Sequence, residues 1–192
     1  GDRLKKVYRF EQNTPDLFES DVPPETRVLV DQYTDSDELS IGHEIMTIDI
    51  EVEVTDGFPD IHKADNRITS IAVHNTSSDV YIAYVLDESK KLRLQSKDDI
   101  VIHSFEDEFS LLQKFYMDYM KTLPTIITGW NIDTFDIPYL YNRSCNIVGK
   151  NIADCLSPIR TVYWNKHRKR YMIAGVSCLD YYSLSVSYTH LT

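Results

Sequence analysis

Acidic side chains alternate with aliphatic ones in the segment IDIEVE, residues 48–53. Alternate side chains of an extended strand point to the same face, so Asp49, Glu51 and Glu53 would share one face while the aliphatic residues enter the core. Any half-exposed strand shows this pattern, and the acids of this segment alone therefore do not identify a site.

A second segment, TGWNIDTFDIPYL at residues 128–140, surrounds polar side chains with apolar ones. Burying Asn131 and Asp136 would be costly unless both have partners. Asp136 lies where an expected strand gives way to an expected helix, and sites of α/β proteins are usually built at the edge where parallel strands end. Asp49, Glu51 and Asp136 could therefore converge at this edge.

Carboxylates clustered in this way repel one another, and their pKa values rise unless a cation compensates the charge. Hard divalent cations prefer oxygen ligands, so Mg²⁺ or Mn²⁺ would suit the cluster better than zinc. Two such ions about 4 Å apart are a recurrent device for phosphodiester cleavage, because one activates a water and the other stabilises the leaving oxygen. The acids predict this chemistry without yet identifying a family.

The elements that must position these acids alternate between strand and helix. Strands are expected at residues 26–33, 44–54, 67–75, 79–87, 99–105 and 125–130, and amphipathic helices at residues 106–123 and 136–149. Pro124 ends the first helix, and Pro138 is tolerated in the first turn of the second. The strands at 67–75 and 79–87 read as a hairpin, and residues 160–175 as a second hairpin around the basic sequence KHRKR. The order predicts an α/β fold.

Composition narrows the class of protein. The chain has 192 residues, of which 42% are hydrophobic, and this content suits a globular protein. The net charge of −10 argues against general electrostatic binding of nucleic acid, although acids that hold metal ions contribute to this sum. Three cysteines without CxxC spacing suggest neither a disulfide framework nor a zinc site, which favours a reducing cytoplasm. No apolar run is long enough to span a membrane.

The wording of the two acidic segments resembles one family. DIEVEVTDGFP at residues 49–59 and ITGWNIDTFDIPYLYNR at residues 127–143 closely resemble the first and second exonuclease motifs of family B DNA polymerases, most of all those of tailed bacteriophages. The first motif has the form DxE and the second the form Nx₂₋₃FD. The matching residues are Asp49 and Glu51 in the first motif and Asn131, Phe135 and Asp136 in the second.

The resemblance implies an RNase H-like 3′-5′ exonuclease fold, a mixed sheet flanked by helices, here truncated at the C-terminus. It implies the proofreading activity of a replicative polymerase, which removes a mispaired nucleotide from the 3′ end of the primer. Asp49, Glu51 and Asp136 match the catalytic and metal-binding carboxylates for two Mg²⁺ or Mn²⁺ ions. The partners implied are DNA, a sliding clamp and other replisome proteins, in the cytoplasm of the host if the chain comes from a phage.

The resemblance also assigns DNA-binding roles. Asn131 would contact the terminal nucleotide, with an N-cap or turn asparagine as the alternative, and Phe135 belongs to the same motif. Phe58 matches an aromatic residue that stacks on a base of the frayed single strand, and the alternative is an aromatic side chain that covers a loop. KHRKR at residues 166–170 matches a hairpin that helps to separate primer from template, or it is a solvated turn.

Three other conspicuous side chains are expected to be structural: Glu53, Asp133 and Trp130, the last in the core. The family also needs a third motif, YxxxD, downstream of Asp136, and no such match follows Asp136 in this sequence. The fragment alone is therefore expected to be inactive. The other hypotheses are a different RNase H-like nuclease or transposase, and a noncatalytic DNA-binding module, which the retained acids disfavour.

Three regions are expected along the chain. Residues 1–43 would be a remnant of the polymerase N-terminal domain, and residues 44–185 a partial exonuclease domain. The last seven residues, VSYTHLT, match the translation of a transposon-based sequencing-library adapter. Residues 186–192 are therefore expected to be a non-native tail that packs poorly.

Overall fold

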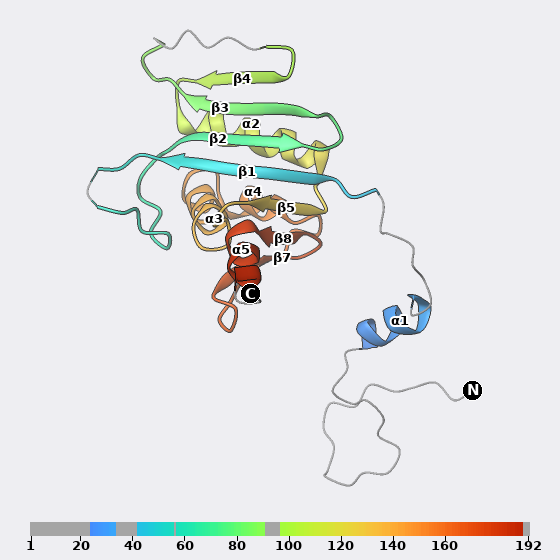
Figure 1. The fold of residues 1–192 in the computed structure, drawn as a ribbon. Helices are drawn as coiled ribbons and strands as arrows, with labels where there is room; N and C mark the ends of the chain where they lie inside the picture. Colours follow the sequence, from blue (N-terminus) through green and yellow to red (C-terminus); the bar gives the residue numbers. More distant parts are fainter. Residues whose placement is uncertain (1–23, 34–41, 56, 91–96, 190–192) are drawn as a thin grey trace. The chain divides into compact units, whose positions relative to one another are not determined.

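The computed structural model describes residues 24–33, 42–55, 57–90 and 97–189 (Figure 1). The chain divides into two compact units, residues 1–41 and residues 42–192. The described part of the first unit is one helix, α1 (Pro24–Tyr33). The strand expected at residues 26–33 is therefore wrong.

The helix α1 has local causes that hydrophobic periodicity does not reveal. A short apolar run such as Val28–Val30 is compatible with either a strand or a helix segment. Pro24 suits the first helical position, where its missing N–H costs nothing. Arg27 and Asp31, one helical turn apart, form an ion pair with an Nε–Oδ1 distance of 2.9 Å.

A six-stranded mixed sheet forms the centre of the second unit (Figure 1). Its strands are β1 (Ile45–Val52), β2 (Ile68–Asn75), β3 (Val80–Leu86), β4 (Ile100–Phe105), β5 (Ile126–Gly129) and β8 (Ser177–Asp180). They lie in the order β4-β3-β2-β1-β5-β8. β1, β2 and β3 are antiparallel, which confirms the expected first hairpin, whereas β4, β5 and β8 each run parallel to a neighbour.

Two longer helices pack on this sheet, α2 (Glu108–Thr122) and α3 (Asp136–Ile147). α2 contacts β2, β3 and β4, while α3 contacts β1 and α2. Asp107 caps α2 by accepting the N–H of Ser110 at 2.8 Å. The C-cap residue Leu123 has a φ of +43° and precedes Pro124. The expected α/β fold, a mixed sheet flanked by helices, is confirmed.

The sheet buries one face of β1 and leaves the other open. Met46, Ile48 and Ile50 are each at most 5% exposed. Asp49, which lies between Ile48 and Ile50, and Glu51, which follows Ile50, are exposed. This alternation is the strand period that the sequence predicted. The core facing β1 is completed by Leu111, Leu112, Phe115, Tyr116 and Tyr119 of α2 and by Ile137 and Leu140 of α3.

The remaining elements follow α3 in the chain. A short helix α4 (Lys150–Ala153) and a 3-10 turn η1 (Asp154–Leu156) lead to an antiparallel hairpin of β6 (Val162–Asn165) and β7 (Arg170–Ile173). This confirms the second expected hairpin, whose tip at residues 166–169 is exposed.

A final helix, α5 (Tyr181–Thr189), follows β8 and runs into the expected tail. Val186 on this helix is 40% exposed. The non-native origin of residues 186–192 stays a prediction.

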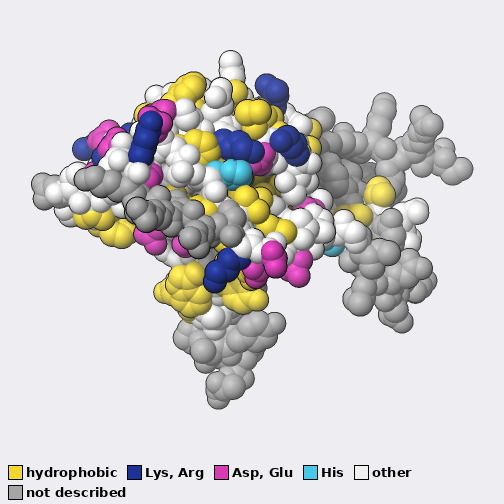
Figure 2. Space-filling model, turned by 90° about the horizontal axis from the view of Figure 1, so that it is seen from above, with side chains coloured by type: hydrophobic (Ala, Val, Ile, Leu, Met, Phe, Trp, Pro, Cys, Tyr) yellow, Lys and Arg dark blue, Asp and Glu magenta, His cyan; other side chains and the backbone are white. Residues whose placement is uncertain are grey.

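The surface carries charges of both signs. Figure 2 shows Lys and Arg side chains interspersed with Asp and Glu on one face. Within the described ranges, no helix is long and apolar enough to cross a membrane.

Candidate functional site

Asp49 and Glu51 lie on β1 with their side chains exposed. The pairing of β1 with β2 becomes irregular between Glu51 and Val52, where β1 ends. Glu53 beyond this point binds Arg67 through two bonds, Nη2–Oε1 at 2.9 Å and Nε–Oε2 at 3.0 Å, which lower its pKa. The expected row of three acids thus contains two exposed carboxylates and one that a cation already neutralises.

Asp136 is the first residue of α3 and is 4% exposed. Its Oδ1 atom accepts the backbone N–H of Ile50 at 3.0 Å. β5 pairs with β1 only along residues 45–47, so β1 continues beyond this pairing to the point where Asp136 meets it. Because Ile50 lies between Asp49 and Glu51, the bond brings Asp136 to the stretch of β1 that carries both acids.

The charge of Asp136 is strongly perturbed. Its pKa is raised to about 6, first by burial and also by the negative charges of Asp49 and Asp180, while the hydrogen bond from Ile50 opposes the rise. Burial disfavours the ionised carboxylate, and the neighbouring negative charges add to this effect. A cation placed among these carboxylates would favour their ionised form.

The turn between β5 and α3 requires a close approach of two backbones. A Cβ atom at Gly129 would lie 2.4 Å from the carbonyl oxygen of Ile48 on β1, so only glycine fits there. Asn131 follows with a φ of +62°, and its side-chain oxygen accepts the hydroxyl of Thr134. The expected alternative for Asn131, a turn asparagine, thus describes its contacts in the structure.

Asp180, at the end of β8, holds this turn and was missed in the sequence analysis. It is 4% exposed, and it accepts the N–H groups of Asn131 at 2.9 Å, Asp133 at 3.1 Å and Tyr182 at 2.9 Å. The only signal in the sequence is one acid at the end of an apolar strand. Because both of its carboxylate oxygens accept backbone N–H groups, Asp180 fixes the turn before α3.

A buried ion pair ties the second hairpin to the same turn. Asp133 is 7% exposed and pairs with Nη1 of Arg170 on β7. Burial raises the pKa of Asp133, and Arg170 opposes this rise. One basic residue of KHRKR therefore serves the structure of the site, while residues 166–169 at the tip are exposed.

Trp130 is not a core residue, and this expectation was wrong. Its side chain is 61% exposed and packs edge-on against Tyr182, with the ring centroids 5.6 Å apart. Ile127 and Gly129 of β5 are buried, so the alternation along the strand directs Trp130 away from the core face.

An open groove lies beside Glu51, with a volume of about 410 Å³. Phe58 is 83% exposed at this groove, and its ring contacts Phe135 with the centroids 5.2 Å apart. The lining residues are Ile50, Glu51, Val52, Val54, Gly57, Phe58, Pro59 and Phe135. The structure therefore brings together Glu51 and the two aromatic side chains expected to bind DNA.

The sequence matches a known family over most of its length. The family described as DNA polymerase family B, exonuclease domain, matches residues 19–192. The chain belongs to this family. Its mixed sheet with flanking helices is the RNase H-like exonuclease fold that the sequence analysis expected.

The chain is also similar to DNA polymerases of two phages. The chain is 33% identical to the DNA-directed DNA polymerase of Escherichia phage RB69 over 167 residues, 73% of this chain and 18% of the relative. It is 30% identical to that of Enterobacteria phage T4 over 164 residues, 70% of this chain and 18% of the relative. The chain thus spans less than a fifth of the length of these polymerases.

The exonuclease family implies dependence on metal ions. Among the residues that the structure describes, no three His, Cys, Asp or Glu side chains are grouped closely enough to hold an ion. The donors nevertheless fit a hard cation, because the acids near Ile50 offer carboxylate oxygens, and the negative charge of Asp49 adds to burial in raising the pKa of Asp136. Binding of an ion would then require the acids to draw closer together.

Proposed function

We propose that this chain is part of a replicative family B DNA polymerase and carries its proofreading 3′-5′ exonuclease site. The observation that carries the proposal is the bond from Ile50 to Asp136, which places a buried carboxylate of α3 against the β1 segment with Asp49 and Glu51. A groove lined by the exposed ring of Phe58 and the partly buried ring of Phe135 adjoins the same segment. The reaction is hydrolysis of the terminal phosphodiester of the primer.

In this proposal Asp49, Glu51 and Asp136 hold two Mg²⁺ or Mn²⁺ ions. When bound, the ions supply an activated water and stabilisation of the leaving oxygen. The chain's own contribution is to bring the start of α3 to the β1 segment that carries Asp49 and Glu51, as the hydrogen bond of Ile50 does for Asp136. Asp180 contributes by fixing the turn that leads into α3.

The substrate in this proposal is the single-stranded 3′ end of DNA. Phe58 would stack on a base, which stabilises binding by about 1 to 3 kcal/mol without sequence preference. Phe135 supports the ring of Phe58, and Asn131 would contact the terminal nucleotide. Mispaired ends are preferred because fraying them costs less than opening a matched duplex.

The activity of the whole protein follows from the same proposal. The whole protein would also synthesise DNA and would bind a sliding clamp and other replisome proteins. It would act in the cytoplasm, which is that of the host if the protein comes from a phage. The chain alone would be nearly inert, because the residues of the third motif are not in it and misplaced catalytic groups cost orders of magnitude in rate.

The test extends the chain into the downstream sequence of the intact gene and follows the length of a labelled primer in Mg²⁺, with and without nucleotides. Asp136→Ala should abolish shortening and leave extension largely intact. Glu51→Gln should do the same, whereas the matched control Glu53→Gln should retain degradation, because Glu53 is bound to Arg67. Shortening by Asp136→Ala at the wild-type rate would overturn the proposal.

A further inference from the structure

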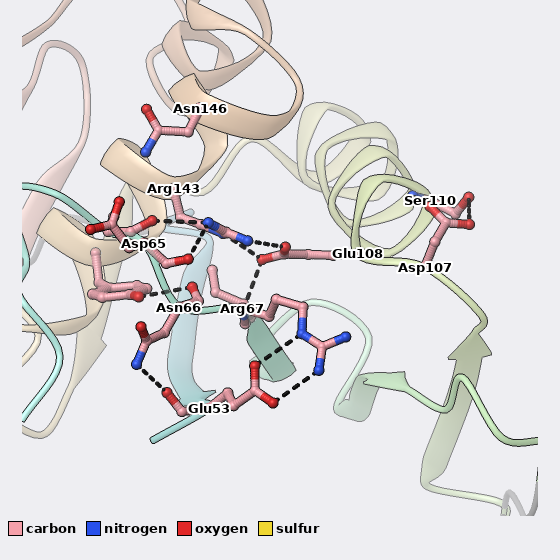
Figure 3. A network of polar contacts seen from close by, with 12 residues as sticks. Glu53, Asp65, Asn66, Arg67, Asp107, Glu108, Ser110, Arg143 and Asn146 are labelled. Carbon is pink, nitrogen blue, oxygen red and sulfur yellow. Dashed lines mark hydrogen bonds and ion pairs between the residues drawn. The ribbon is translucent and has the colours of Figure 1, made fainter. Parts of the chain in front are cut away.

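One face of α3 binds the segment that follows Phe58. Its side chains at positions i, i+3, i+4 and i+7 each donate to backbone carbonyls of residues 61–66, and Figure 3 shows part of this network. The bonds run from Tyr139 to Asn66 at 2.8 Å, from Asn142 to Ile61 at 2.7 Å, from Arg143 to Ala64 at 3.1 Å and Asp65 at 2.8 Å, and from Asn146 to Lys63 at 3.0 Å. Residues 61–66 are thus hydrogen-bonded to α3, the helix that begins with Asp136.

The segment also contains a turn closed by its own hydrogen bonds. Asp60 accepts the N–H groups of His62 at 2.8 Å and Lys63 at 3.1 Å, which closes a turn directly after Pro59. Pro59 and Ala64 are buried. Phe58 precedes this turn by two residues, so the position of its exposed ring depends on how residues 61–66 are held.

Asn142 alone among these four side chains also reaches the second hairpin. Its Nδ2 atom donates to the carbonyl of Ile61, and its Oδ1 atom accepts the hydroxyl of Tyr171 on β7 at 2.8 Å. A second contact joins the hairpin to residues 61–66: the rings of His62 and of Trp164 on β6 meet edge to face, with the centroids 5.7 Å apart. The hairpin and the segment after Phe58 therefore meet at Asn142.

We propose that Asn142 is a positioning residue that couples the β6–β7 hairpin to the Phe58 ring. Its amide has one donor side and one acceptor side, and each is used by a different element. A displacement of the hairpin would break the bond between the hydroxyl of Tyr171 and the amide of Asn142. The amide would then be free to turn, and its bond to the carbonyl of Ile61 would weaken. The single-stranded end held at Phe58 then loses its fixed place relative to Asp136. The inference rests on the proposed function for its consequence, although the coupling itself does not.

The test uses the 192-residue chain in EDTA, so that no strand is cut. Affinity for a short fluorescein-labelled single-stranded oligothymidylate is measured by anisotropy, and amide hydrogen exchange is followed at residues 61–66. Asn142→Ala removes both bonds, and Tyr171→Phe removes only the hydroxyl. Each should lower affinity about three- to ten-fold and speed exchange of the segment by a similar factor.

Two comparisons separate positioning from general stability. The double variant Asn142→Ala with Tyr171→Phe should be no weaker than Asn142→Ala alone, since both act through one amide. In a Phe58→Ala background, Asn142→Ala should cause no further loss of affinity. The matched control Asn146→Ala removes a bond to Lys63 on the same helix face without touching the hairpin, so its effect should add to that of Tyr171→Phe.

The outcomes are distinguishable. Unchanged exchange at residues 61–66 in Tyr171→Phe would overturn the coupling, as would a loss that adds to that of Asn142→Ala. A wild-type chain that does not bind the oligothymidylate would count against the proposed function, while hydrogen exchange would still decide whether Asn142 couples the two elements.

Discussion

The Oδ1 atom of Asp136 lies 3.0 Å from the backbone nitrogen of Ile50, although 85 residues lie between these two in the sequence. This bond joins the start of α3 to the middle of β1. It holds a buried carboxylate beside two exposed ones. Burial, together with the charge of Asp49, raises the pKa of Asp136 to about 6, and this hydrogen bond opposes the rise.

Neutralising Asp136 should stabilise the chain in the absence of divalent ions. The folded-state pKa is about 6 against an ordinary value of 3.8, so the folded state binds more protons between these values and stability falls as pH rises through this window. Asp136→Asn removes this penalty. At pH 7 in EDTA it should raise the free energy of unfolding by up to about 3 kcal/mol, and the gain should vanish near pH 4.

The same pair of proteins tests the metal. Mg²⁺ should raise the melting temperature of the wild type and leave that of Asp136→Asn nearly unchanged, because binding to the folded state alone stabilises it. Equal stabilisation of both proteins by Mg²⁺ would show that the ion binds elsewhere.

Removing the carboxylate of Asp180 should destabilise the turn before α3. Asp180→Ala leaves the N–H groups of Asn131 and Asp133 without their acceptor in a buried place, which should cost about 2 to 4 kcal/mol in urea unfolding. The control Asp79→Asn, whose side chain is 92% exposed in its pair with His74, should change stability by less than about 1 kcal/mol. A loss for Asp180→Ala as small as the control's would contradict the supporting role.

Breaking the buried pair of Arg143 and Glu108 should be costly. Their Nη2–Oε2 distance is 2.6 Å, and Glu108 also accepts the N–H of Ile68 at 2.8 Å (Figure 3). Arg143→Met leaves Glu108 buried without its cation and should lower the free energy of unfolding by about 3 to 5 kcal/mol.

The exposed pair of Lys90 and Glu106 is a matched control for that experiment. Their side chains are 67% and 65% exposed, so Lys90→Met should change stability by less than about 1 kcal/mol. Similar losses in Lys90→Met and Arg143→Met, measured by urea unfolding, would show that burial does not set the strength of these pairs.

Deleting residues 186–192 should leave the melting temperature unchanged within error. The described residue Val186 is 40% exposed on α5, and an adapter-derived sequence was never selected to complete the core. A large drop in melting temperature would show that these residues belong to the fold and that their adapter origin is wrong.

The sequence predicted β1 to β7, α2 and α3 because their causes are local, whereas α4 and α5 were not among the expected elements. Alternation along β1 and the spacing of apolar residues in α2 are set by the geometry of a strand and a helix. The prediction of a strand at residues 26–33 was wrong because a short apolar run does not by itself distinguish a strand from a helix. The neighbouring residues favoured the helix α1.

The sequence by itself determined the family, through the residue types and spacing of its two motifs, and with the family the expected acids at Asp49, Glu51 and Asp136. Only the tertiary structure decided which polar side chains support them. The partners of Asp180 lie 47 and 49 residues away, and Asn142 reaches a carbonyl 81 residues away. Such bonds depend on which strands become neighbours and where each strand ends, and neither can be predicted from local hydrophobic periodicity.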